Sequence, residues 1–93
     1  MRRISQRKDA NHDTIVTAYE SYGWQVLDLT RLGDGKPDIA VAPPPFDRLY
    51  LVEIKTPKGK LKLKQVAFAE RWPVRVVRTS ADVAAHVAEI RNT

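Results

Sequence analysis

Two carboxylates and an ammonium group stand in the most strand-like part of this sequence. Asp38 opens the apolar run DIAVA, and Glu53 and Lys55 lie near the end of the apolar run LYLVEIK. If the two runs pair as a hairpin with Ala42 opposite Leu49, Asp38 falls opposite Glu53, with about 5 Å between their Cβ atoms. Lys55 then shares the face of Glu53, because side chains alternate along a strand. A slip of one residue would separate the three groups.

Such a cluster suits the hydrolysis of a phosphodiester. Two neighbouring carboxylates repel each other unless one is protonated or a cation bridges them, and hard oxygen ligands favour Mg²⁺ or Mn²⁺. Lys55 beside the metal could orient or deprotonate the attacking water, or offset negative charge in the transition state. The alternative is an edge strand whose outward charges prevent aggregation, and the spacing alone leaves that alternative open.

The periodicity of apolar residues predicts an α/β fold with the element order α-β-β-β-α-β-α. The segment PPPFDR reads as a hairpin turn, and the helix between the third and fourth strands is a crossover, which favours parallel pairing. We therefore expect a mixed four-stranded sheet flanked by helices, with Trp24 and Trp72 in the core. Helices are expected at 9–23, capped by Asp9 or Asn11, at 63–72, and after Ser80 as a cap. Strands are expected at 24–29, 38–42, 49–55 and 74–79.

Length and composition indicate one domain with a basic surface. The chain has 93 residues and a net charge of +5. We expect a basic arm at 1–8 and a single domain at 9–93. The positive charge favours a polyanion, such as nucleic acid, as the partner. The sequence has no long apolar run and no signal-peptide pattern, which predicts a cytoplasmic protein without a membrane segment.

In the sequence, basic residues lie on both sides of the segment that holds Asp38, Glu53 and Lys55. The segment PKGKLKLK follows the Glu53 strand, and the segment RLGDGK precedes Asp38. Side chains in these segments could bind the phosphate backbone of DNA, although solvated loops and glycine turns would give the same pattern. The predicted DNA-binding residues are Arg31, Lys36, Lys58, Lys60, Lys62 and Lys64.

The sequence resembles the PD-(D/E)XK nuclease superfamily, and within it the VRR-NUC branch of small nucleases. PD at 37–38 is followed by EIK at 53–55, and the stretches GDGKPDIAV, YLVEIKTPKGKLKLKQ and VRVVRTSADV look like that branch over roughly residues 9–88. The resemblance implies a restriction-endonuclease-like core. It also implies an endonuclease that depends on Mg²⁺ or Mn²⁺ and leaves a 5′-phosphate.

The same resemblance implies roles for individual residues. Asp38, Glu53 and the backbone carbonyl of Ile54 would hold the metal, Lys55 would be the catalytic lysine, and Gln65 would lie near the site. Stand-alone members of this branch often resemble Holliday-junction resolvases and act as homodimers on duplex or branched DNA, in a bacterium or a phage-infected cell. A two-fold pair of copies would also suit a two-stranded substrate, because one site cuts one strand.

The first helix departs from the superfamily pattern. Many members carry an acidic residue there, whereas this sequence reads NHDT at 11–14. His12 stands nearest the expected position and could ligate a metal or orient a water, and the alternative is a surface residue at the helix start. Two other functions therefore stay open. One is a DNA-binding module of the same fold with weakened catalysis, and the other is a structural or inhibitory protein whose basic surface binds another protein.

Overall fold

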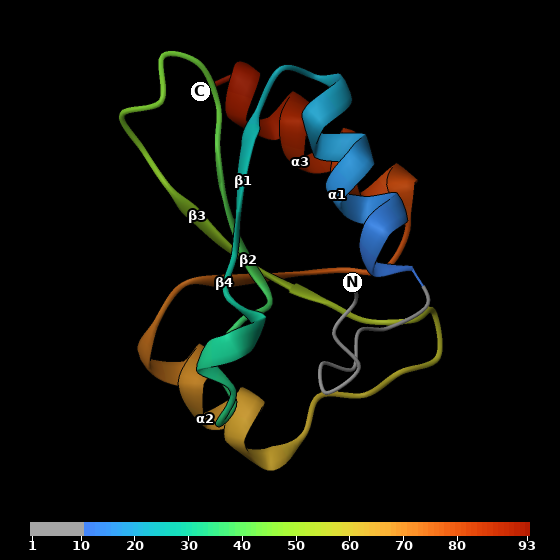
Figure 1. The fold of residues 1–93 in the computed structure, drawn as a ribbon, viewed down its shortest axis with the longest axis vertical. Helices are drawn as coiled ribbons and strands as arrows, with labels where there is room; N and C mark the ends of the chain where they lie inside the picture. Colours follow the sequence, from blue (N-terminus) through green and yellow to red (C-terminus); the bar gives the residue numbers. More distant parts are fainter. Residues whose placement is uncertain (1–10) are drawn as a thin grey trace, which may run out of the picture.

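The computed structural model describes residues 11–93, and the predicted arm at 1–8 and the predicted cap Asp9 lie outside the described residues. The described chain forms a four-stranded mixed sheet with helices on both faces, as predicted (Figure 1). The elements in chain order are α1 (His12–Ser21), β1 (Gln25–Asp28), the 3₁₀ helix η1 (Thr30–Leu32), β2 (Ile39–Ala42), β3 (Tyr50–Ile54), α2 (Leu63–Arg71), β4 (Val74–Val77) and α3 (Ser80–Arg91).

The strands lie side by side in sequence order. β2 is antiparallel to both β1 and β3, and β3 is parallel to β4, which confirms the predicted crossover through α2. The predicted hairpin register is also confirmed, since Ile39 faces Val52. The paired register ends at Ile39 and Val52, and Asp38, which directly precedes β2, keeps contact with β3 through its N–H, which donates to the Val52 carbonyl over 3.1 Å.

α1 and α3 pack against each other and cover one face of the sheet (Figure 1). Every second strand side chain points toward these helices. The core formed there contains Ile15, Tyr19, Trp24, Ile39, Val41, Val52, Ile54, Val77, Val83 and Val87. α2 lies on the opposite side of the sheet (Figure 1), and none of its residues is fully buried. No helix within residues 11–93 is long and apolar enough to cross a membrane.

Two helix starts differ from the predicted caps. Thr79, rather than Ser80, caps α3: the Thr79 hydroxyl accepts a hydrogen bond from Asp82 N–H, and the Asp82 carboxylate accepts one from Thr79 N–H. This reciprocal pair satisfies N–H groups that the first turn of a helix leaves free. Asn11 does precede α1, but its side chain caps no N–H of that helix and binds elsewhere.

The two tryptophans have different environments. Trp24 is buried in the core as predicted, with its ring centroid 5.5 Å from that of Tyr19. The prediction is wrong for Trp72, which is 54% exposed and stacks on Phe68. Trp72 directly follows α2, which ends at Arg71.

Gly35 allows the loop before β2 to approach the start of α2. Its φ is +82°, and a Cβ at this position would lie 2.7 Å from Lys64 Cβ and 2.8 Å from the Lys64 carbonyl oxygen. Any side chain here would therefore push the loop and the helix apart. Glycine at this position serves a turn with positive φ and a close contact within the protein.

Gly35→Ala is expected to lower the free energy of unfolding by about 2–4 kcal/mol, since a left-handed backbone and a steric clash both act against alanine. Gly23→Ala is the matched control, because Gly23 has a φ of +84° but open space around it. The free energy of unfolding of this control should fall by about 1 kcal/mol, because only the backbone conformation opposes alanine there. Urea unfolding of both variants measures the difference. Equal losses of unfolding free energy would show that the close contact with Lys64 does not affect stability.

Candidate functional site

The candidate site lies near the end of β3, on the row of residues that contains Glu53. Glu53 is level with Val76 of β4, and Asp38 directly precedes β2, whose first residue Ile39 is paired with Val52. This row faces α2, because Val52 and Ile54 on either side of Glu53 point into the core beneath α1 and α3. The alternation predicted from the sequence therefore places Glu53 and Lys55 outside the main core.

Besides Asp38, two polar side chains lie close to the Glu53 carboxylate. The Glu53 side chain is buried, with 3% of the residue exposed. Gln65 Nε2 donates a hydrogen bond to Glu53 Oε2 over 2.9 Å, and Lys55 Nζ lies 3.7 Å from the same oxygen. Gln65 Oε1 in turn accepts the N–H of Lys62 at the start of α2, over 2.8 Å. This second bond fixes the Gln65 amide, which then holds the Glu53 carboxylate in one orientation.

Asp38 is held by the backbone of β3. Its N–H donates to the Val52 carbonyl over 3.1 Å, and its Oδ2 accepts the N–H of Ile54 over 2.8 Å. The N–H and C=O of one strand residue point to the same side of the strand. The Ile54 carbonyl, which was predicted as a metal ligand, is therefore directed toward the side of β3 on which Asp38 lies.

Burial raises the pKa of Glu53 to about 8. Repulsion by Asp38 and a hydrogen bond shared with that carboxyl act in the same direction, whereas Lys55 lowers the pKa of Glu53. The pair of carboxyl groups therefore retains a proton near neutral pH. A cation that replaced this proton would relieve the repulsion between the two groups.

The donor set fits a hard divalent cation with few protein ligands. Asp38 and Glu53 supply carboxylate oxygens, and Mg²⁺ commonly binds one or two carboxylates while keeping several waters. Within residues 11–93 there is no cluster of three or more His, Asp and Glu side chains that could hold a metal ion. The residues present thus fit Mg²⁺ or Mn²⁺ held by two carboxylates and water.

His12, the candidate on the first helix, is the first residue of α1 and is 3% exposed. The alternative of a surface residue is therefore wrong. In the described part of the chain, His12 forms no metal-binding cluster with Asp38 and Glu53. Its role as a ligand or in orienting a water stays a prediction.

Asn11 binds backbone carbonyl groups beside the site, a role that the sequence did not predict. Its Nδ2 donates to the carbonyl oxygens of Lys55 and Arg78, over 2.9 Å in each case, and so ties the ends of β3 and β4 to the start of α1. Its Oδ1 is buried and has no hydrogen-bond partner among residues 11–93. The partners lie 44 and 67 residues away along the chain, so no local pattern could have indicated this role.

The predicted DNA-binding residues divide into two groups. Lys36, Lys62 and Lys64 line a hollow of about 490 Å³ that also contains Asp38 and Gln65, and we call it the polar hollow. The remaining three are exposed but do not line the polar hollow: Arg31, Lys58 and Lys60. The structure thus places half of the predicted set in a hollow that Asp38 also lines.

Two lysines of the polar hollow already have partners. Lys64 Nζ lies 2.7 Å from Asp34 Oδ1, and the hydrogen bond from Lys64 lowers the pKa of Asp34. Lys36 Nζ lies 5.9 Å from the centroid of the Phe68 ring. An ion pair between exposed groups contributes about 0–1 kcal/mol, so a phosphate could displace Asp34 from Lys64 at little cost.

Comparisons with known proteins find nothing similar to this chain. A scan against protein-family models, a search of curated proteins and a search of solved structures each give no match. The interpretation of the site therefore rests on its own residues and on their geometry.

Proposed function

We propose that this protein is an endodeoxyribonuclease that depends on Mg²⁺ or Mn²⁺ and has a restriction-endonuclease-like core. The observation that carries the proposal is the buried Glu53 carboxyl, placed beside Asp38 and 3.7 Å from Lys55 Nζ. Burying a carboxyl with a raised pKa costs stability, and such groups gather at functional sites. The basic polar hollow next to them suits a polyanionic substrate.

The contacts of each residue support a specific role. Asp38 and Glu53 would hold the metal, which when bound polarises the phosphodiester and lowers the pKa of a water. Lys55, whose side chain is 12% exposed, would orient the attacking water, accept its proton once the amine is neutral, or as the ammonium balance negative charge on the phosphate. Gln65 would keep the Glu53 carboxylate in its orientation through the two hydrogen bonds of its amide.

The phosphate backbone of duplex or branched DNA would enter through the polar hollow. Lys36 and Lys62 stand on the wall that also contains Asp38 and Gln65, so a bound phosphate would be positioned close to the carboxylates. Selectivity for branched structures, as in Holliday-junction resolvases, and action as a homodimer belong to the same proposal.

A cleavage assay tests the proposal. Single-stranded, duplex, flap and four-way-junction DNA are each incubated with Mg²⁺, with Mn²⁺ or with EDTA, and Glu53→Ala is assayed in parallel. We expect cutting that requires the metal and that disappears in the variant. The substrate that is cut fastest identifies the preferred DNA structure.

Two outcomes of this assay would replace the proposal. Metal-dependent cutting by Glu53→Ala at the wild-type rate would remove Glu53 from the site. Binding of DNA without cutting under any of these conditions would indicate a DNA-binding module of the same fold, and the residues at 11–14 would then be the first to examine for the missing chemistry.

A further inference from the structure

Two aromatic rings lie stacked on the surface at the end of α2. The ring centroids of Phe68 and Trp72 are 5.9 Å apart, and their planes are inclined by only 10°. Trp72 is 54% exposed, and Phe68 is half-buried. Two side chains four residues apart stabilise a helix only slightly, so helix stability alone gives little reason for an exposed tryptophan. Exposed tryptophan is typical of a surface that binds another molecule.

Phe68 connects this pair of rings to the candidate site. It lines a small cavity that Glu53 and Gln65 also line. Lys36 Nζ lies 5.9 Å from the centroid of the Phe68 ring, so a cation of the polar hollow reaches the same side chain. Phe68 therefore neighbours both the buried carboxyl of the site and the exposed indole of Trp72.

A hollow of about 450 Å³ opens beside the two rings, and we call it the Trp72 hollow. The two rings line it together with three cations, Lys36, Lys64 and Arg71, and with the carboxylate of Asp34. Three positive charges and one negative charge leave an excess of two positive charges. Within residues 11–93 the Arg71 guanidinium forms no ion pair. The Trp72 hollow therefore suits an anionic ligand that also has an aromatic part.

The Trp72 hollow is continuous with the polar hollow. Asp34, Lys36 and Lys64 line both hollows, and Asp38 lines the polar hollow. Lys64 and Trp72 are eight residues apart, which is about 12 Å along a helix. A strand of duplex DNA rises about 3.4 Å per nucleotide, so this distance corresponds to a few nucleotides. A DNA strand with one phosphate beside Asp38 and Lys64 can thus extend along α2 to the rings.

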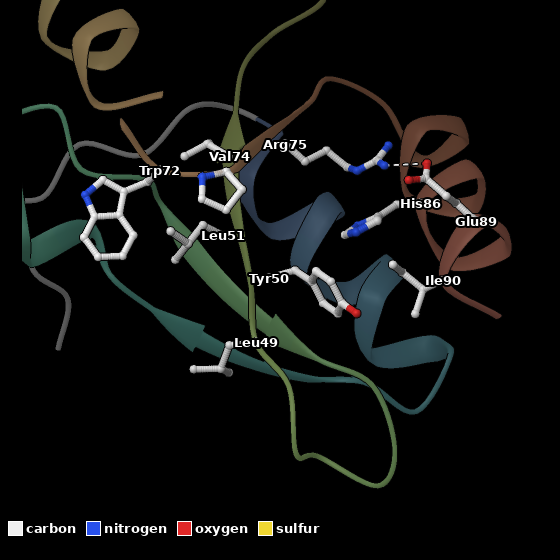
Figure 2. A pocket seen from close by; sticks show the side chains of 10 residues that line it. Leu49, Tyr50, Leu51, Trp72, Val74, Arg75, His86, Glu89 and Ile90 are labelled. Carbon is white, nitrogen blue, oxygen red and sulfur yellow. Dashed lines mark hydrogen bonds and ion pairs between the residues drawn. The ribbon is translucent and has the colours of Figure 1, made fainter. Parts of the chain in front are cut away.

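Trp72 also borders a second hollow, of about 820 Å³. Figure 2 shows the indole and Leu51 at one end of this hollow, and the paired side chains of Arg75 and Glu89 at the other end. The charged pair is therefore remote from the indole, and the end at Trp72 offers an apolar surface. A planar base can lie against the indole there, while the cations of the Trp72 hollow bind phosphate.

We propose that Phe68 and Trp72 form a platform on which an unpaired DNA base stacks, while the cations of the Trp72 hollow bind the adjoining phosphates. The choice of DNA rests on the proposed nuclease function, and the platform specifies the substrate class as DNA with unpaired nucleotides beside the site. In a continuous duplex the neighbouring base pairs cover both faces of each base, so the indole finds no partner. Aromatic rings beside a positively charged groove are the usual means of binding single strands.

DNA binding in EDTA tests the platform without cleavage. The probes are a labelled oligothymidylate, followed by fluorescence anisotropy, and a relaxed closed-circular duplex, which has no unpaired ends and competes for the protein. Both affinities are measured at one salt concentration. Trp72→Ala should lower the affinity for oligothymidylate, relative to that for the duplex, by about 10-fold to 100-fold, as expected for a lost stacking contact. Trp72→Phe keeps a ring and should retain most of the preference.

Phe46→Ala is the matched control for the loss of an exposed ring. Phe46 is 46% exposed in the turn between β2 and β3, which lies at the opposite end of the molecule from α2 (Figure 1). This variant should keep both affinities. Arg71→Gln should weaken the binding of both probes alike and lower the slope of log affinity against log salt concentration by about one. Far-UV circular dichroism checks that the variants are folded.

Tryptophan fluorescence provides an independent signal, because the chain has only two tryptophans and Trp24 is buried. A thymine stacked on the Trp72 indole should quench its emission, so oligothymidylate should quench the wild type and not Trp72→Phe. An unchanged preference in Trp72→Ala, or equal quenching by the closed-circular duplex, would overturn the platform. Tighter binding of oligouridylate than of oligothymidylate would overturn the choice of DNA.

The platform and the nuclease can fail separately. A wild-type protein that binds oligothymidylate through Trp72 but cuts no DNA with any metal would refute the nuclease and leave the platform standing. Metal-dependent cutting that Glu53→Ala abolishes, together with a binding preference that Trp72→Ala does not alter, would do the reverse.

Discussion

Lys55→Met should lower metal-dependent cleavage of DNA by about 10²–10⁴-fold, the range expected for loss of a positioned acid–base group. The methionine keeps an apolar stem of similar length, so the packing around the side chain, which is only 12% exposed, is largely retained. The ammonium group stands 3.7 Å from Glu53 Oε2 and therefore next to any phosphate that binds beside the carboxylates. Its loss removes a hydrogen-bond donor to the attacking water or a compensating charge, and leaves both carboxylates in place.

Metal binding separates this role from a structural one. Lys55 lowers the pKa of Glu53, and a divalent cation repels an ammonium group. At a pH well above the pKa of Glu53 in both proteins, where protons no longer compete with the metal, Lys55→Met should therefore bind Mn²⁺ at least as tightly as the wild type, as measured by calorimetry. Cleavage at the wild-type rate with saturating DNA and metal would exclude Lys55 from the chemistry.

Lys60→Met is the matched control, because Lys60 is exposed in the loop that follows β3 and does not line the polar hollow. This variant should keep the wild-type rate at saturating DNA. If Lys60 contacts a phosphate, the slope of log affinity against log salt concentration falls by about one. A loss of rate equal to that of Lys55→Met would show that the assay reports general electrostatics rather than a specific lysine.

The hairpin that places the carboxylates could be predicted because its constraints are local. The segment PPPFDR excludes a continuous strand, and the apolar runs on both sides fix which side chains alternate. A slip of one residue would turn one strand's apolar side chains out of the core, and the observed register, in which Ile39 faces Val52, ends one residue from both Asp38 and Glu53. The site geometry thus follows from the same pattern that forms the core.

Contacts between distant segments could not be predicted in this way. Asn11 fits a helix cap from its neighbours, but its amide binds carbonyls on β3 and β4, and this is visible only once the fold is complete. Trp72 resembles a core residue by type, yet it follows the end of α2, where it is exposed and stacks on Phe68. The cap of α3 is a different case: Thr79 followed by Asp82 is a recognisable capping pattern, so the sequence did contain the signal.

Glu53→Gln should abolish metal-dependent cleavage and at the same time stabilise the metal-free protein at alkaline pH. The folded protein holds the pKa of Glu53 at about 8, above its ordinary value of 4.5. Below pH 4.5 the carboxyl is protonated in both the folded and the unfolded chain, so it has no effect on stability. Between pH 4.5 and 8 the unfolded chain releases a proton that the folded chain keeps, and the free energy of unfolding falls as pH rises. Above pH 8 Glu53 is ionised in both states, and the cost of burying its charge lowers the free energy of unfolding by the full amount.

Glutamine has nearly the same shape and carries no charge, so it should avoid this penalty. Without metal, Glu53→Gln is expected to exceed the wild type in stability by about 3–5 kcal/mol at pH 9, and to equal it near pH 4. Urea unfolding at a series of pH values measures the difference. Glu70→Gln, which alters an exposed carboxylate on α2, should show no such pH dependence.

The affinity for Mn²⁺ should also depend on pH through the titration of Glu53. Binding requires Glu53 to lose its proton, so the apparent affinity of the wild type should rise about tenfold per pH unit up to pH 8 and level off above it. Glu53→Gln should bind Mn²⁺ weakly and without this steep rise. If the variant were no more stable than the wild type at pH 9 and the affinity of the wild type were flat with pH, Glu53 would not be the buried, protonated carboxyl on which the proposed site depends.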